Sequence, residues 1–254
     1  MYDFGDLPKA NDRLWAAIRD NLRSQGLPAP ETLTRDPEEL WALWRAPDLV
    51  LAQTCGFPYR AKLHGHVTLI GTPDYQLEGC APGEYCSVLV AQRDDDRPDF
   101  TAFHGANLAY NDVMSQSGWA APQNYARSLG LTLLPGPMTG AHRDSARAVA
   151  EKRADLAALD AVTFRLLQRV EPQLTAALRV IGFTPPTPGL PLIAALGAPR
   201  GAVFAAVAAA IADLAPRDRD CLGIHGLVKI AAQSYLDVPN PPSPDHIGQS
   251  DCVN

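Results

Sequence analysis

The 254-residue chain lacks the long apolar runs and basic patches that are typical of membrane and nucleic-acid-binding proteins. Its longest apolar run, residues 201–212, is shorter than the roughly 20 residues that a membrane-spanning helix needs. The formal net charge is −6, and Lys and Arg are scattered singly or in pairs, so no surface suits a long row of nucleic-acid phosphates. We therefore expect no membrane insertion and no nucleic-acid partner, and any bound anion must be small and held at one focused site.

Motifs of common catalytic and cofactor-binding sites are also missing. The sequence contains no GxxxxGKS/T phosphate loop, no GxGxxG turn, no GxSxG elbow and no HExxH helix. No two of its five cysteines have CxxC spacing, and no pair of carboxylates stands out for acid–base catalysis. We therefore expect no catalytic residue, no metal site and no cofactor.

The opening residues and the cysteines bear on the compartment. The chain begins MYDFGDLPKAND, with acidic residues where a secretory signal has a basic and then an apolar region. This opening predicts a cytoplasmic protein if the sequence is complete. Cys55 and Cys80 each lie beside a glycine in an expected loop, and a disulfide between them would instead require an oxidising compartment. Two half-buried thiols are the alternative, and both interpretations are kept.

Helix-like and strand-like segments alternate along the chain, which predicts an α/β fold with mainly parallel sheets covered by helices. The expected helices span about 12–24 with Asn11 as N-cap, a segment that starts at Asp36-Pro37, and 114–130, 142–155, 161–170, 202–214 and 226–236. The expected strands span 49–53, 67–70, 86–92, 107–111, 131–134, 156–159, 178–183 and 192–196. We expect the proline-rich tail from Asp237 to lie over the surface or to be disordered.

Two irregular stretches are expected to carry the chain between two lobes. One is the polar stretch at about 93–103, and the other is the proline-rich stretch at 183–191. They predict a discontinuous lobe I of residues 1–100 and 188–254, with lobe II, residues 101–187, inserted into it.

The sharpest chemical signal is Ser115-Gln116-Ser117-Gly118, which follows an expected strand and opens an expected helix. Serine hydroxyls and the unpaired N–H groups of a first helical turn can hold an anion, and the helix dipole favours negative charge there. An ordinary helix cap is the alternative, because serine is favoured at that position in any helix.

Three further positions follow expected strands. Thr54 and Tyr59 lie in a loop after residues 49–53 and would offer hydroxyl groups at a strand end. His142 lies at a strand-to-helix junction and would titrate near neutral pH, and Asp160 ends a short apolar strand. For these positions a Gly-Pro turn and two helix caps are the alternatives.

Three segments together resemble the phosphate, phosphite and phosphonate substrate-binding proteins of ABC transporters, a branch of the type II periplasmic binding proteins. They are QTCGFPY at 53–59, YNDVMSQSG at 110–118 and GAHRDSARAVAEKRADLAALDAVT at 140–163. The resemblance runs from the opening MYDF to about Ile193. It implies two α/β lobes joined by two crossings, with the ligand between the lobes.

The resemblance also implies a set of ligand-binding residues that face the cleft. Ser115–Ser117 match the motif that binds phosphoryl oxygens, and the others match a cleft histidine, a cleft acid and aromatic or loop positions of the first lobe. Together with the loop hydroxyl of Thr54, the set is Tyr2, Thr54, Tyr59, Ser115, Gln116, Ser117, His142 and Asp160.

The function implied is capture of a small oxyanion by hinge closure, for delivery to an ABC transporter permease from a periplasmic location. Two other interpretations remain. One is an enzyme on the same fold that acts on a small phosphorylated or heterocyclic metabolite. The other is a cytoplasmic sensor, which the missing export signal favours.

Overall fold

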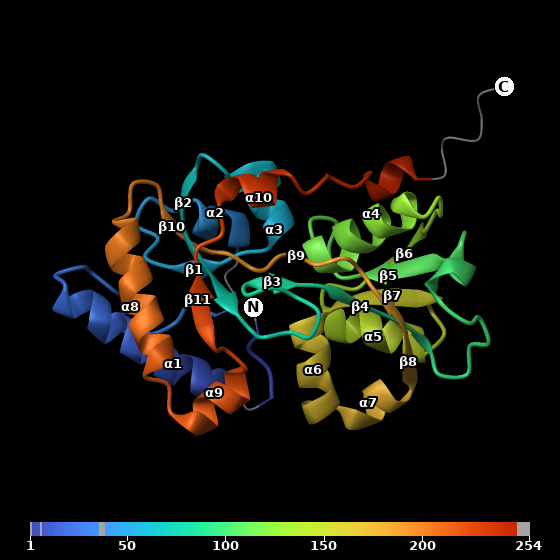
Figure 1. Cartoon of the computed structure of the whole chain (residues 1–254), viewed down its shortest axis with the longest axis horizontal. Coiled ribbons are helices and arrows are strands. Elements are labelled where there is room, and N and C mark those ends of the chain that lie inside the picture. Colours follow the sequence, from blue (N-terminus) through green and yellow to red (C-terminus); the bar gives the residue numbers. More distant parts are fainter. Residues whose placement is uncertain (1, 6, 36–38, 248–254) are drawn as a thin grey trace. The chain divides into compact units, whose positions relative to one another are not determined.

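The computed structural model describes residues 2–5, 7–35 and 39–247 of the chain. Its backbone contacts divide the chain into two compact units, drawn in Figure 1. The first unit consists of residues 1–84 and 188–237, and the second consists of residues 85–187 and 238–254. The chain therefore passes from one unit to the other three times, at 84/85, 187/188 and 237/238.

These bounds differ from the lobes expected from the sequence at two places. Residues 85–100 belong to the second unit because β4 (Ser87–Gln92) pairs with β7 (Leu156–Asp160) and β8 (Leu178–Phe183). The tail from Val238 also belongs to the second unit. The 187/188 passage lies inside the expected stretch at 183–191.

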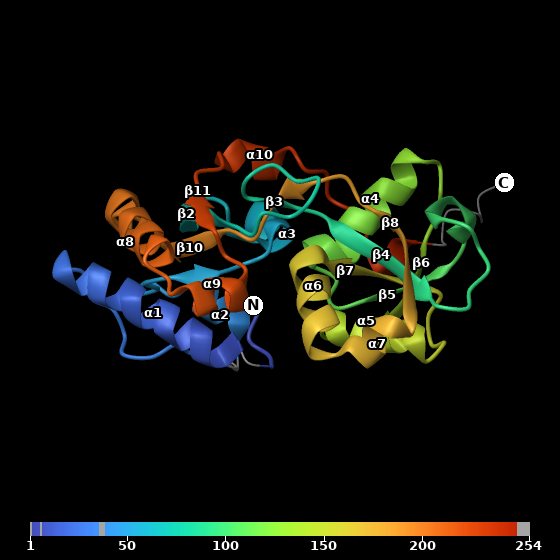
Figure 2. The same ribbon diagram turned by 60° about the horizontal axis from the view of Figure 1, so that its bottom comes forward.

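The first unit has a four-stranded sheet with the order β1-β10-β2-β11. Its strands are β1 (Ala52–Gln53), β2 (Val67–Asp74), β10 (Leu192–Ala195) and β11 (Gly226–Val228). Its helices are α1 (Leu7–Ser24), α2 (Leu40–Trp44), α3 (Gly56–Pro58) with a π-helical turn (Tyr59–Leu63), α8 (Arg200–Ala212), α9 (Pro216–Leu222) and α10 (Ala232–Leu236). Figures 1 and 2 show α1 beside α8, where Asn21 donates a hydrogen bond to the Ala206 carbonyl.

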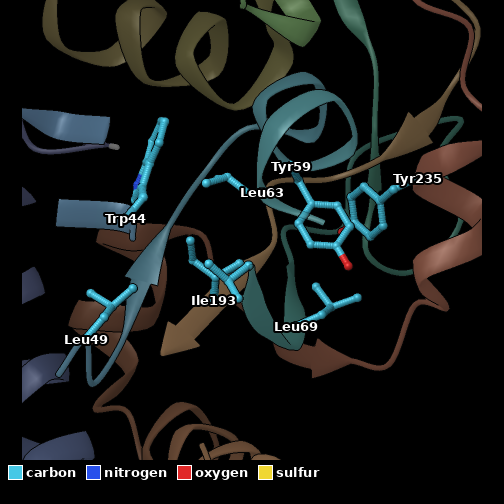
Figure 3. Packing of buried hydrophobic residues seen from close by; sticks show 8 residues of the cluster. Trp44, Leu49, Tyr59, Leu63, Leu69, Ile193 and Tyr235 are labelled. Carbon is cyan, nitrogen blue, oxygen red and sulfur yellow. The ribbon is translucent and has the colours of Figure 1, made fainter. Parts of the chain in front are cut away.

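Helix α8 has apolar residues all round, which suits a helix packed between α1 and the sheet. On the other side of the sheet, a cluster of buried side chains joins α2, the π-helical turn, the sheet and α10. Figure 3 shows the rings of Tyr59 and Tyr235 against each other in this cluster, with Leu69 nearby.

The first unit also has a pocket of about 1210 Å³ that opens to solvent and is lined mainly by apolar side chains of α1, α2, β1 and the segment 28–35. Trp15 and Trp44, which line it, bury indole N–H groups that meet no hydrogen-bond acceptor within the described residues.

The second unit has a five-stranded sheet with the order β6-β5-β7-β4-β8. Strands β5 (Asn107–Tyr110) and β6 (Leu134–Met138) are parallel to each other, and β5 is parallel to β7, whereas β4 is antiparallel to both of its neighbours. The helical segments are a 3₁₀ turn (Phe100–Phe103), a π-helical turn (Gln116–Ala120) that continues into α4 (Ala121–Ser128), α5 (His142–Ala150), α6 (Ala161–Val170) and α7 (Pro172–Ala176). In Figures 1 and 2, α4 lies on one face of the sheet, and α5 and α7 lie on the other.

Strand direction differs from the expectation of mainly parallel sheets. Every recorded pair in the sheet of the first unit is antiparallel. The reason is that β10 follows the second passage of the chain and runs back between β1 and β2. The remaining two-stranded sheet pairs β3 (Glu84–Tyr85) with β9 (Thr187–Pro188), at two of the passages.

Two local expectations are corrected, and one open alternative is decided. Residues 226–236 do not form one helix, because β11 pairs with β2 before α10 begins. Asn11 is not an N-cap but lies inside α1, where its amide donates to the Tyr2 carbonyl and to Asp3. Cys55 and Cys80 are thiols, so no disulfide joins them. The expected helix start at Asp36-Pro37 lies outside the described residues.

Candidate functional site

Three parallel strands of the second unit end at the same edge of its sheet, and each is followed by a helix. The end of β5 at Tyr110 leads to the helical segment at Gln116, β6 leads to α5 at His142, and β7 leads directly into α6 at Ala161. Because the carboxyl ends of neighbouring parallel strands meet, the first turns of these three helices lie along one edge. This is where ligands bind in open α/β sheets.

The helical segment after β5 begins in a way that fixes its first turn. The Ser115 hydroxyl accepts a hydrogen bond from the Gly118 N–H (2.9 Å), and the Ser115 carbonyl accepts from the Ala120 N–H (2.9 Å). The second bond spans five residues and makes this turn π-helical, a form that occurs often at functional sites. Ser115, Gln116 and Ser117 are all buried. Ser115 is therefore the helix cap that the sequence allowed, and capping leaves a ligand role for its neighbours open.

Ser117 is joined to the next helix start. Its hydroxyl lies 2.9 Å from Nε2 of His142, the first residue of α5. Burial lowers the pKa of His142 to about 4, and the Ala158 carbonyl partly opposes that change. The imidazole is therefore neutral at pH 7, and it can either donate to Ser117 or accept from it.

Asp160 occupies the third junction, and only 2% of it is exposed. Its carboxylate accepts a hydrogen bond from the Thr163 N–H (2.9 Å), so it caps α6, as one interpretation of the sequence proposed. Across the sheet it faces Ser87, the first residue of β4. The Ser87 hydroxyl donates to the Ser117 carbonyl (2.9 Å), which links β4 to the Ser115–Ser117 turn.

Gly118 is required by a close approach of side chains. A Cβ at this position would lie 2.0 Å from Oδ1 of Asn111 and 3.2 Å from Cε1 of His142. Asn111 also accepts a backbone hydrogen bond from Gly140, in the loop before α5. Asn111 therefore packs between the starts of two helices, and only glycine leaves room for it.

The remaining sequence-derived candidates belong to the first unit. Thr54 follows β1 and is fully buried, and its hydroxyl has no hydrogen-bond partner within the described residues. Tyr59 lies in the hydrophobic cluster, with its ring 5.2 Å from that of Tyr235 and 5.9 Å from that of His64. Tyr2 packs edge-on against Tyr75 at 5.4 Å. A joint role of these residues with those of the second unit stays a prediction.

Sequence reasoning missed Ser87 and Asn111 as parts of the site. Ser87 was visible only as a polar residue at the start of the apolar run CSVLVAQ. Asn111 stands in the YNDVMSQSG segment, four residues before Ser115. Its proximity to Gly118 depends on how the chain turns after β5, which no sequence pattern specifies.

Two searches of the described residues bear on the kind of site. No group of three or more His, Cys, Asp or Glu side chains there could hold a metal ion. None of the helices in the described ranges combines the length and apolar character that a bilayer crossing requires.

Comparison with known proteins gives one family and several solved structures. Residues 8–235 match the model of the family described as "ABC transporter, phosphonate, periplasmic substrate-binding protein". No curated protein sequence matches the chain. This family comprises transporter substrate-binding proteins rather than enzymes.

The similar structures include PhnD1 from Prochlorococcus marinus in complex with methylphosphonate, with a TM-score of 0.68, 15% identity and coverage of 90% of each chain. XAC2383 from Xanthomonas citri, bound to ATP, has a TM-score of 0.66 and 17% identity, and the match covers 89% of this chain and 90% of that one. A binding protein component of an ABC phosphonate transporter from Pseudomonas aeruginosa has a TM-score of 0.62 and 14% identity, with 92% and 81% covered. These similarities confirm the predicted fold class.

Proposed function

Because the chain belongs to the family of periplasmic substrate-binding proteins of phosphonate ABC transporters, we propose that its second unit holds the oxyanion group of the solute. In this proposal Ser115, Gln116 and Ser117 present the first helical turn to the ligand oxygens. His142 and Asp160 contribute from the two neighbouring helix starts.

The observation that carries the proposal is the hydrogen bond between Ser117 and His142. It joins the first turns of two helices that follow adjacent parallel strands. Helix starts offer N–H groups and the positive end of the helix dipole, and both favour an anion. A hydroxyl and a neutral imidazole add hydrogen bonds to that anion without adding a full positive charge.

The energetics are sufficient without a lysine or arginine. A micromolar complex requires about −8 kcal/mol. Hydrogen bonds to charged groups contribute about 1.5–3 kcal/mol each, so four or five of them give roughly 6–15 kcal/mol, and the upper part of that range also covers costs of ordering and desolvation.

Asp160 would make the site selective for a protonated oxyanion. Its carboxylate is buried and already accepts from the Thr163 N–H. A buried carboxylate repels a fully ionised ligand but accepts a hydrogen bond from a ligand hydroxyl. We therefore assign it the hydroxyl of a monoanionic phosphonate, phosphite or phosphate.

The proposal also includes the first unit and the transporter. Thr54, whose buried hydroxyl meets no partner among the described residues, would close on the ligand from that unit, with Tyr2 and Tyr59 supporting the surrounding loops. The loaded protein would deliver the solute to an ABC transporter permease from the periplasm, as the family description implies.

Isothermal titration calorimetry with methylphosphonate, phosphite and phosphate tests the proposal. Methylphosphonate is the first probe because it is bound by PhnD1 from Prochlorococcus marinus. Ser117→Ala should weaken binding roughly 10- to 100-fold, since it removes one hydroxyl that contacts a charged ligand. Ser128→Ala is the matched control, because Ser128 is exposed at the end of α4 and bonds only its own helix turn. Equal binding by the two variants would exclude Ser117 from the site.

A further inference from the structure

The proline-rich tail lies on the second unit directly beside the proposed oxyanion site. The indole N–H of Trp119 donates a hydrogen bond to the Pro242 carbonyl (3.0 Å), and the Asn124 amide donates to the Pro239 carbonyl (2.8 Å). Trp119 is completely buried and directly follows Gly118, and Asn124 lies one turn later in α4. The tail therefore contacts the same helical segment that begins at Ser115.

The backbone of the tail suits this kind of recognition. Ser243 has φ −65° and ψ 146°, which are polyproline II values, and the prolines at 239, 241, 242 and 244 fix their own φ near −65°. A polyproline II segment makes no internal hydrogen bonds, so its carbonyls are available to donors on another surface. Aromatic side chains commonly bind such segments, because the extended shape is fixed before binding and costs little entropy.

A second aromatic residue extends the surface. The ring of Tyr110 lies 4.7 Å from that of Trp119. Burial raises the pKa of the Tyr110 hydroxyl, and the nearby charges of Asp245 in the tail and Asp112 raise it further. Tyr110, Trp119 and Asn124 thus form what we call the tail-binding surface. It lies on the end of β5 and on the helical segment that follows it.

Because the tail-binding surface includes part of the first turn of the proposed oxyanion site, a change at this surface can move residues of the site. The first turn, from Gln116 to Ala120, is π-helical, and a single π turn persists where neighbouring contacts hold it in place of an ordinary α-helical turn. Trp119 lies inside this turn, and the Pro242 carbonyl fixes its indole. A change in the direction of Trp119 would move Gly118 and Ser117, and with them the hydroxyl that meets His142.

We propose that the tail-binding surface is a docking site for a proline-rich segment, that the chain's own residues Pro239–Pro244 occupy it, and that this docking sets the affinity of the neighbouring oxyanion site. The part about affinity rests on the proposed function. The docking itself does not, and the two can be tested separately.

The first experiment removes the tail and then returns it. A chain that ends at Asp237 should bind methylphosphonate about tenfold more weakly than the full chain, within the range usual for coupling between two sites. A synthetic peptide DVPNPPSPDHI, which copies residues 237–247, should restore most of that loss, whereas the same peptide with its four prolines replaced by alanine should restore little of it. Unchanged affinity after truncation, with the full chain binding normally, would overturn the link between docking and affinity.

A second measurement keeps the docking testable if methylphosphonate does not bind at all. Trp119 is the one tryptophan of the second unit, so its fluorescence should change when the peptide is added to the truncated chain. Absence of any change with the copied peptide would overturn the docking site whatever the anion result. A fluorescence change together with no anion binding would support the docking and contradict the proposed function.

A third variant covers the case in which the truncated chain does not fold. In the full chain, Trp119→Phe keeps an aromatic ring but removes the N–H that Pro242 accepts. It should weaken methylphosphonate binding about threefold, which corresponds to loss of a single weak hydrogen bond. Trp41→Phe is the matched control, because Trp41 lies in α2 of the first unit. Equal affinities for the two variants would contradict the role of the indole N–H.

Discussion

The two units differ in the kinds of polar group that they bury, although each buries some polar atoms without a partner among the described residues. In the second unit, buried hydroxyls are used: Ser87 donates to Ser117, Ser115 accepts from Gly118, and Ser117 meets His142. In the first unit, the hydroxyls of Thr72 and Tyr235 share a buried hydrogen bond (2.6 Å), whereas the indole N–H groups of Trp15 and Trp44 meet no partner among the described residues. Oδ1 of Asn111 and Nδ1 of His142, in the second unit, also meet no partner among those residues.

The two units also differ in how closely parts of them are packed. The first unit has an open pocket of about 1210 Å³ with mainly apolar walls, whereas β7 at the centre of the second unit's sheet is buried along its whole length. We infer that the second unit is closely packed around the hydroxyl hydrogen bonds of its helix starts, whereas the first unit has more freedom to adjust next to its open pocket. Four predictions test this contrast.

The largest expected effect concerns core leucines. Leu159→Ala in β7 of the second unit should cost about 4 kcal/mol of unfolding free energy, because a closely packed site cannot collapse around the lost atoms. Leu222→Ala, at the wall of the pocket in the first unit, should cost about 2 kcal/mol, because residues beside an open pocket can relax around the lost atoms. Urea unfolding of both variants measures the difference. Equal costs would remove the packing contrast.

The next effect concerns pH and His142. Its pKa is about 4 in the folded chain against 6.5 as the ordinary value, so between those pH values the unfolded chain binds a proton that the folded chain does not. Stability should therefore fall as the pH drops from 6.5 to 4, by about 3 kcal/mol in total from this group. His142→Gln should lose this part of the slope, which calorimetric melting at a series of pH values would measure. An unchanged slope would show that the imidazole is not held neutral.

A third prediction compares two glycines. Gly118→Ala should cost about 2 kcal/mol, because the new Cβ would overlap Oδ1 of Asn111. Gly201→Ala, in α8 of the first unit, should instead raise stability by about 0.5 kcal/mol, since a Cβ there meets nothing within 4 Å and alanine favours helices. Thermal melting of the two variants gives the comparison, and a harmless Gly118→Ala would contradict the close approach of Asn111.

The smallest effect concerns two hydroxyls. Thr54→Val removes a buried hydroxyl with no partner among the described residues and should raise stability by about 1 kcal/mol. Ser87→Ala leaves the Ser117 carbonyl without its donor and should lower stability by about 1 kcal/mol. The stability measurements should be paired with methylphosphonate titrations of both variants. A stabilised Thr54→Val that also binds less tightly would support the ligand role of the Thr54 hydroxyl.

Local patterns predicted several elements to the residue. Helix α6 (Ala161–Val170) and strand β8 (Leu178–Phe183) have the expected bounds, because a capping aspartate and a short apolar run mark them within the sequence itself. The prediction of one helix over residues 226–236 was wrong. The apolar spacing of this segment fits a helix, whereas β11 forms only through its pairing with residues 72–74, which are distant in sequence.

Some features of the candidate site could likewise be predicted from the sequence, and others could not. That Ser115–Ser117, His142 and Asp160 all follow strands could be predicted from the alternation of elements. Their arrangement along one edge follows from the parallel pairing of β5 with β6 and β7. The register that sets Ser87 opposite Asp160 could not be predicted, because it depends on strand pairing between segments about 70 residues apart.

The hydrogen bonds of Trp119 and Asn124 to the tail both end on main-chain oxygens. Any amino acid supplies such an oxygen. Selection on this contact would therefore act on the backbone conformation of the tail and on the identity of few of its residues. Homologous tails can therefore diverge beyond recognition by sequence alignment and still keep the same attachment, provided that enough prolines remain to hold the extended shape.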